Sequence, residues 1–527
     1  MNRAVPALIA VVLVAPLLAP ASARAQFLES GLDRHQFDQS LRQPSLRLVT
    51  LGRTGLVFED ENNEINQWDF GRSTVGLLGD RTGHALDLFV DNGDRIAKNT
   101  VGQLTKEVER VDGTVFGLSA VARNADKFAF GIDAGLQHLG TGLPRELGTY
   151  QDDKVGLRDI ALTANGRMLN KTLGWGARLA FGKEEYDHRL RNQTIEDGEL
   201  KLDGGDTFEP LSIFELVEGT GQSTRYGLGL GWMTSPLGDL SINWDHSALT
   251  VRGNQNTRRR IYEVEEPRGI DIWSVVATLR PVEGVTFGGT AGVGSYDTEE
   301  TYRFSLSLGQ GAPPAISRGT RYVKDVEGRF LRTRIAIEPE ALPDLTIGGD
   351  FNVRYEKEVA TAATGEASFN EFLDFAERNG FILGPHIENT LDELRHWDGG
   401  VGVGYQVTED VKVGIEGHRA NDALDGTIVH ARRQVTDLRG GVEASLGTEW
   451  KGRLGGWRRQ LDEDVFTENN EGVATALTLG AGWQPTGSKW TLDGGVEILG
   501  RSTDYPDPSD GTGSGFRFVL YNRWAFD

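Results

Sequence analysis

The run LGWGARLAFG, residues 173–182, decides the fold of this chain. Its odd-numbered positions are all apolar, and its even-numbered positions are glycine, alanine or arginine. Strict alternation with a period of two is typical of a β-strand that has one apolar face. The same pattern recurs in residues 127–136, 226–233 and 345–356. Because this alternation dominates the chain and helical periodicity is nearly absent, we predict an all-β protein.

The length and ends of these runs point to a membrane. Many alternating segments run for ten residues or more, whereas strands of soluble proteins usually have about 5–6 residues. Aromatic residues lie at the ends of the apolar faces, as Trp175 and Phe181 do. Lipid offers no hydrogen bonds, so a sheet that spans it must pair every strand and close. We therefore predict a closed, antiparallel transmembrane β-barrel over residues 84–527.

Short turns between the alternating runs give the number of strands. Bacterial barrels have short periplasmic turns and longer outer loops. Eight short turn signals occur, which imply sixteen strands, at residues 124–126, 168–171, 235–239, 281–284, 339–344, 408–410, 447–452 and 485–488. A strand that starts near residue 84 and a C-terminal strand raise the prediction to about 18. Sixteen is the main alternative, because residues 451–457 form the weakest strand. The longest outer loops are predicted at residues 184–223 and 356–394.

The C-terminal segment carries the sharpest single signal. One of its faces is apolar apart from Asn522, and it consists of Phe516, Phe518, Leu520, Trp524 and Phe526. This pattern resembles the terminal strand of bacterial outer-membrane barrels, which ends in an aromatic residue read by the barrel-assembly machinery. In this chain Asp527 follows Phe526. The resemblance implies that these five residues form an assembly signal.

The N-terminus indicates export. Residues 1–25 form a predicted signal peptide, with Arg3, an apolar run over residues 4–18 and the small residues Ala23 and Ala25 before the cleavage point. Its removal changes the formal net charge from −22 to −24, since Arg3 and Arg24 leave with it. This acidity argues against nucleic-acid binding. The absence of cysteine excludes disulfides and thiol chemistry. We expect a protein of the Gram-negative outer membrane that crosses it with many strands.

Residues 26–83 lie between the signal peptide and the first predicted strand. This segment is long enough to enter the barrel as a plug. An extra N-terminal strand and a periplasmic tail are the alternative interpretations. Near the end of the segment, Arg72-Ser73-Thr74 precedes Val75-Gly76-Leu77. This stretch resembles the N-terminal plug of the outer-membrane long-chain fatty-acid transporter family, with Arg72-Ser73-Thr74 where that family has Asn-Pro-Ala. The resemblance implies a plugged barrel and a groove in the outer loops that captures hydrophobic solutes.

A plug would have to contact a polar wall, so its polar residues are the candidates for that contact. Trp68, Asp69, Phe70 and Arg72 are the predicted plug residues. Asp69 could pair with Arg332 or Arg334 of the wall, and Arg72 with Asp350.

The lumen wall is predicted from the second face of each alternating strand. The positions that point inward include both signs of charge, and the pore-lining candidates are Asp133, Arg178, Asn243, Asp245, Arg332, Arg334, Asp350, Arg354, Lys412 and Glu416. Charged side chains are ordinary in a water-filled lumen, whereas arginine or lysine on the lipid face costs about 2–4 kcal/mol at the midplane. The set therefore supports the assignment of lumen-facing and lipid-facing positions, and it does not indicate selectivity for one class of solute.

No catalytic motif accompanies the barrel pattern, and we predict no enzyme, no catalytic residue, no cofactor and no metal. The function that we expect is an outer-membrane channel for passive or ligand-gated diffusion of a small solute, with hydrophobic solutes among the candidates. The alternative is a structural or adhesive barrel with acidic surface loops, and a polysaccharide-export porin ranks third. The expected partners are outer-membrane lipid and lipopolysaccharide, the barrel-assembly machinery and the solute, with no nucleic acid.

Overall fold

In the part of the chain that the structure describes, nineteen strands form a single sheet. The computed structural model describes residues 51, 56–57, 84–101, 104–124, 128–145, 149–168, 172–196, 199–202, 215–234, 238–257, 260–307, 314–362, 390–426, 430–465, 468–504 and 511–526. The strands are β1 (His84–Val101), β2 (Leu104–Asn124), β3 (Phe128–Arg145), β4 (Thr149–Met168), β5 (Leu173–Glu196), β6 (Glu199–Leu202), β7 (Glu215–Thr234), β8 (Gly238–Thr257), β9 (Arg260–Val282), β10 (Val285–Ser307), β11 (Pro314–Ile337), β12 (Leu345–Ala362), β13 (Thr390–Thr408), β14 (Val411–Gly426), β15 (His430–Leu446), β16 (Trp450–Val465), β17 (Glu468–Trp483), β18 (Trp490–Asp504) and β19 (Gly511–Phe526).

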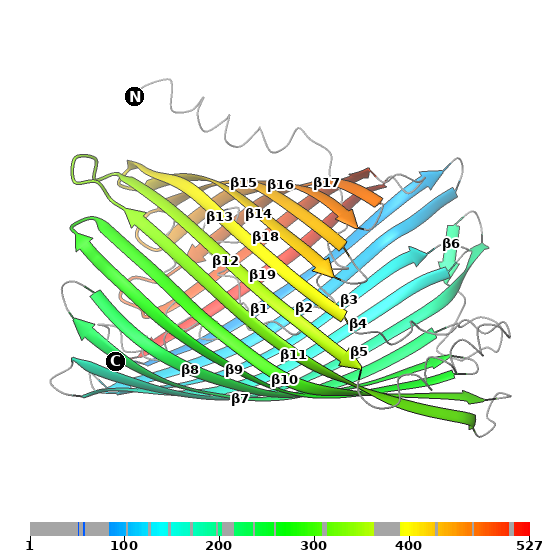
Figure 1. The fold of residues 1–527 in the computed structure, drawn as a ribbon. Helices are drawn as coiled ribbons and strands as arrows, with labels where there is room; N and C mark the ends of the chain where they lie inside the picture. The colour runs from blue at the N-terminus through cyan, green and yellow to red at the C-terminus, as the bar shows by residue number, and fades with distance from the viewer. Residues whose placement is uncertain are drawn as a thin grey trace.

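The sheet closes into a barrel, because β1 pairs with β2 on one side and with β19 on the other. Pairing follows chain order, except that β5 pairs with β7 past the four-residue strand β6, and that β6 forms one parallel bridge to β2. Without β6, eighteen long antiparallel strands form the ring in Figure 1. The prediction of a closed barrel of about 18 strands is confirmed. The segment that was weakest in sequence lies within β16.

The eight predicted turns all fall at junctions between paired strands. They share one end of the barrel with its two terminal strands, since His84 is paired with Phe526 there. Short turns mark this end as periplasmic. Gly284 and Gly447 occupy two of the turns with φ angles of 73° and 82°. Residues that carry a side chain rarely adopt such backbone angles, which explains glycine at these positions.

Large apolar side chains cover the outer surface of the barrel. Leu230 is 59% exposed, Ile242 is 55% exposed and Val401 is 71% exposed, and each alternates along its strand with buried neighbours. Such an extensive apolar surface on a closed barrel is matched by lipid and not by water. The protein is therefore a transmembrane barrel of the outer membrane, as the alternation predicted.

Tryptophans gather at the periplasmic end of this apolar surface. The ring of Trp483 stacks on that of Trp450 with centroids 5.6 Å apart and meets Trp490 edge-on at 4.9 Å. Their amphipathic rings suit the border between lipid and water. Trp490 Nε1 also donates to Asn522 Oδ1 at 2.5 Å. This bond gives a partner to the one polar residue that interrupts the apolar face of β19.

The two longest outer loops were predicted to be longer than they are in the structure. Within predicted loop 184–223, β5 continues to Glu196 and β7 begins at Glu215. Within predicted loop 356–394, β12 continues to Ala362 and β13 begins at Thr390. Strand pairing satisfies the backbone in water as it does in lipid, so charged hairpins can extend the sheet beyond the membrane. No helix in the described part of the chain is both long and apolar enough to span a membrane.

Candidate functional site

Three residues of the N-terminal segment lie against the inner wall of the barrel. Leu51, Leu56 and Val57 form a small apolar cluster, and their exposed fractions are 0%, 5% and 1%. They are the residues of the N-terminal segment that the structure describes. The wall that they contact is formed by β12, β13, β14 and β15.

Glycines in the wall make room for this segment. A Cβ atom placed on Gly441 of β15 would lie 2.5 Å from the carbonyl oxygen of Leu51. On Gly404 of β13 it would lie 3.0 Å from Val57 Cβ, and on Gly348 of β12 it would collide with the backbone of Leu56. Real Cβ atoms essentially never come closer than 3.0 Å to another atom, so a larger residue at Gly348 or Gly441 would displace the segment, and one at Gly404 would press against Val57. We call this strip, Gly348, Gly404 and Gly441, the glycine groove.

Glu416 on β14 holds the segment by its backbone. One carboxylate oxygen, Oε1, accepts from the backbone N–H of Leu56 and from that of Val57, the latter at 3.1 Å. The other oxygen, Oε2, lies 3.1 Å from His418 Nε2. The side chain of Glu416 has no exposed surface. A buried carboxylate is costly without partners; here Oε1 has two partners and Oε2 has one.

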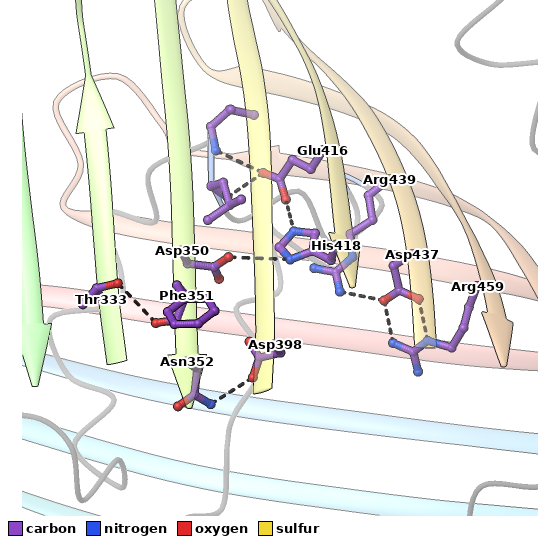
Figure 2. Close-up of polar contacts among 12 residues, drawn as sticks. Thr333, Asp350, Phe351, Asn352, Asp398, Glu416, His418, Asp437, Arg439 and Arg459 are labelled. Atoms are coloured by element: carbon purple, nitrogen blue, oxygen red, sulfur yellow. Dashed lines mark hydrogen bonds and ion pairs between the residues drawn. The ribbon is translucent and has the colours of Figure 1, made fainter. Parts of the chain in front are cut away.

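The contacts continue around the wall from Glu416, as Figure 2 shows. His418 Nδ1 lies 3.8 Å from Asp350 Oδ1 on β12. One strand further along, Asp437 on β15 accepts from Arg439 Nη2 at 2.8 Å and from Arg459 Nε at 2.7 Å. Acidic and basic groups thus lie beside one another across the wall.

Two further clusters repeat this pairing. His396 on β13 lies between Asp398 at 2.7 Å and Asp422 at 2.5 Å. Arg453 on β16 contacts both Glu443 and Asp493. In each cluster one basic side chain lies between two carboxylates, and these contacts hold the lumen side chains in place.

The predicted pore-lining residues on β11, β12 and β14 lie on the same wall. Arg332 lies with its guanidinium 5.7 Å from the Phe330 ring, and Arg334 is paired in register with Asp350. Arg354 Nε is 3.0 Å from Glu356 Oε1. Lys412 is opposite Glu443 in the β14–β15 register. The structure thus brings six of the ten predicted residues together, because Asp350 and Glu416 complete the set.

Other predicted residues lie elsewhere. Arg178 on β5 and Asn243 and Asp245 on β8 are buried, with exposed fractions of 8%, 1% and 4%. His246, the next residue after Asp245, instead contacts Asp271 at 3.0 Å on the outer surface. The side chain of Asp133 and the plug candidates Trp68, Asp69, Phe70 and Arg72 lie outside the described residues.

Sequence reasoning missed the contact at Leu51, Leu56 and Val57. The apolar residues of this stretch carry no strand pattern and no charge, so they offered no signal for a polar wall. The signal that was available lay in the wall itself. Gly402 and Gly404 on β13 and Gly414 on β14 flank Glu416, and this concentration of glycine leaves space for another chain segment.

Comparisons with known proteins give fold-level likeness. No family model matches the chain, and no curated protein matches it. A Pseudomonas aeruginosa FadL homologue is 11% identical, with a TM-score of 0.39, covering 91% of this chain and 97% of that chain. The Pseudomonas putida toluene transporter TodX is 10% identical, with a TM-score of 0.37 and coverages of 91% and 97%. The ferric citrate transporter FecA is 10% identical, with a TM-score of 0.41 and coverages of 84% and 79%. These identities and scores are too low to assign a family or a substrate.

Proposed function

We propose that this protein is a channel for a small solute across the outer membrane, and that its N-terminal segment is a plug seated in the lumen. The observation that carries the proposal is the contact between Glu416 and the backbone of Leu56 and Val57. A segment that comes before the first strand is bound, by buried hydrogen bonds, inside a membrane-spanning barrel. A purely structural barrel has no need of such a contact.

The glycine groove supports a seated plug for a second reason. Gly348, Gly404 and Gly441 come from three strands, and all of them lack the side chain that would fill the place of the segment. Glycine weakens a strand by leaving its backbone less constrained and its face unpacked. That cost is offset where another chain segment occupies the space.

The wall favours a solute with little net charge. Its arginines and carboxylates are engaged with each other, as Asp437 is with Arg439 and Arg459. A solute ion would have to compete with these partners, whereas a neutral or hydrophobic solute would not. Leu51, Leu56 and Val57 also place an apolar surface beside the path. We therefore propose a small, neutral or hydrophobic solute.

Planar-bilayer conductance tests the channel. The full-length protein should show rare, brief openings, and a chain without residues 26–80 should show a larger and steadier conductance. Heat-modifiable gel mobility must show that both proteins form barrels. A truncated barrel that assembles and never conducts would contradict the channel and favour a structural or adhesive role. Loss of assembly would mean that the segment is needed for barrel formation and is not a removable plug.

A cell-based assay complements the conductance measurement. In an outer membrane that carries the truncated chain, permeability to small hydrophobic antibiotics should rise relative to the full-length chain at equal expression. The point variant Glu416→Ala offers a matched, less drastic version of the same test. Unchanged permeability in both well-assembled proteins would refute the plug.

A further inference from the structure

Three arginines on the outer, lipid-facing surface of the barrel lie at the same distance from the periplasmic ends of their strands. They are Arg329 on β11, Arg419 on β14 and Arg458 on β16, which we call the outer arginine row. Arg329 is paired with Val293, which is 58% exposed, and Arg458 is paired with Leu438, which is 48% exposed. Pairing places both members on the same face of the sheet, so the row points away from the lumen.

The row has a constant height along the barrel. Arg329, Arg419 and Arg458 each lie eight residues from the periplasmic end of their strands, which are at residues 337, 411 and 450. Eight residues of a tilted strand rise by roughly 20 Å, and the apolar band of such barrels is about 25 Å tall. The outer arginine row therefore lies near the outer border of the apolar band, where lipid headgroups begin.

The row differs from the arginines of the lumen in its partners. Within the described ranges, Arg329, Arg419 and Arg458 make no ion pair with a carboxylate. Arg329 lies over the ring of Tyr355 at 4.9 Å, and Arg419 Nη2 donates to the neutral Gln434 Oε1 at 3.1 Å. In a chain with 77 acidic and 55 basic residues, carboxylates are plentiful. An anionic group from outside the protein could therefore act as the counter-ion of these three arginines.

We propose that the outer arginine row binds the phosphate groups of lipopolysaccharide in the outer leaflet. Guanidinium groups match phosphate oxygens with two parallel hydrogen bonds and are less strongly hydrated than ammonium groups. Arg419 and Arg458 lie two strands apart, so their long side chains can reach one headgroup. The exposed ring of Trp397, 38% exposed, lies on the same face at the border where aromatic residues settle. This site is independent of the proposed channel.

Binding of lipid A to the purified, delipidated full-length barrel tests the proposal. The test variant is Arg419→Gln with Arg458→Gln, and the control is Arg395→Gln. Arg395 is 59% exposed on the same face, but Glu393 already pairs with it at 2.7 Å. Two exposed charge contacts of about 0.7 kcal/mol each correspond to an affinity about tenfold weaker in the double variant. The control should lose less than about twofold, because its carboxylate partner competes with phosphate.

The lipid itself supplies a second comparison that does not depend on variants. Bisphosphorylated lipid A should bind the unmodified barrel about tenfold more tightly than dephosphorylated lipid A, through the same charge contacts. Equal binding of the two lipids would overturn the proposal. It would also be overturned if Arg395→Gln weakened binding as much as the double variant, or if inorganic phosphate alone competed at the same concentration as lipid A. Failure of the double variant to assemble would leave the decision to this lipid comparison.

Discussion

Replacing Glu416 by alanine should release the N-terminal segment from the wall. The change removes one carboxylate oxygen that accepts two backbone N–H groups, from Leu56 and Val57. Hydrogen bonds to a charged group contribute about 1.5–3 kcal/mol each. Water from the lumen can replace part of this, so we expect a net loss of about 2 kcal/mol, or a roughly 30-fold rise in the undocked fraction.

Thiol labelling can measure this fraction directly, because the chain has no cysteine of its own. A Leu51→Cys background introduces one thiol at a position with 0% exposure. If only the undocked segment reacts, a maleimide should label the Glu416→Ala protein roughly 30-fold faster than its background. Labelling is measured on the refolded barrel in detergent, with heat-modifiable mobility as proof of assembly.

A neighbouring carboxylate gives the matched control. Asp437→Asn also removes a buried charge from the wall, but its partners are Arg439 and Arg459. This variant should label at nearly the background rate. Labelling of Glu416→Ala within threefold of the background, or an equal acceleration in Asp437→Asn, would refute the docking argument.

Three further outcomes test the groove, the facing of the strands and one periplasmic turn. Gly441→Leu should exclude the segment and accelerate labelling at Leu51→Cys while the barrel still assembles, and slow labelling would show that the groove is not needed. Leu230→Arg should impair assembly, since arginine near the midplane of lipid costs about 2–4 kcal/mol. Asp350→Arg, in the lumen, should still assemble. Equal yields of the two variants on a heat-modifiability gel would show that the assignment of lipid-facing and lumen-facing residues is wrong. Hydrogen bonds from Thr486 and Trp483 lower the pKa of Glu449 below its usual value. Its contribution to the free energy of unfolding is therefore complete above the unfolded-state pKa and is lost as the pH falls through the lower folded-state pKa. Glu449→Gln should remove that part of the acid sensitivity in urea-unfolding curves.

Strand positions were predictable because their causes are local. Alternation with a period of two and turn residues such as Pro281 and Gly284 lie within a few residues of each strand end, and the eight turns follow from them. The strand over residues 450–465 was weaker in sequence because three glycines, at 452, 455 and 456, interrupt its pattern. Loop lengths were overestimated, since charged hairpins outside lipid carry no apolar face to mark them.

The candidate site was only partly predictable. Glu416 and Asp350 were recognised as inward-facing from alternation alone. Their partners were not, because Leu56 and Val57 lie 360 and 359 residues away from Glu416 along the chain. Such contacts depend on where the closed wall presents a carboxylate oxygen that can accept, beside glycines that leave space for the segment. No local pattern in residues 51–57 records that arrangement.

The pairing of β1 with β19 makes completion of this protein an all-or-none event. The seam joins His84 to Phe526 and extends over fifteen paired positions, so β1 has no second strand partner until β19 has been synthesised. Any chain that stops before β19 would present two long unpaired edges, and each unsatisfied backbone group in lipid costs several kcal/mol. Chains that lack β19 should therefore be unstable in the membrane and remain substrates for chaperones and proteases. Quality control of this barrel therefore depends on the sixteen-residue strand β19, which closes it.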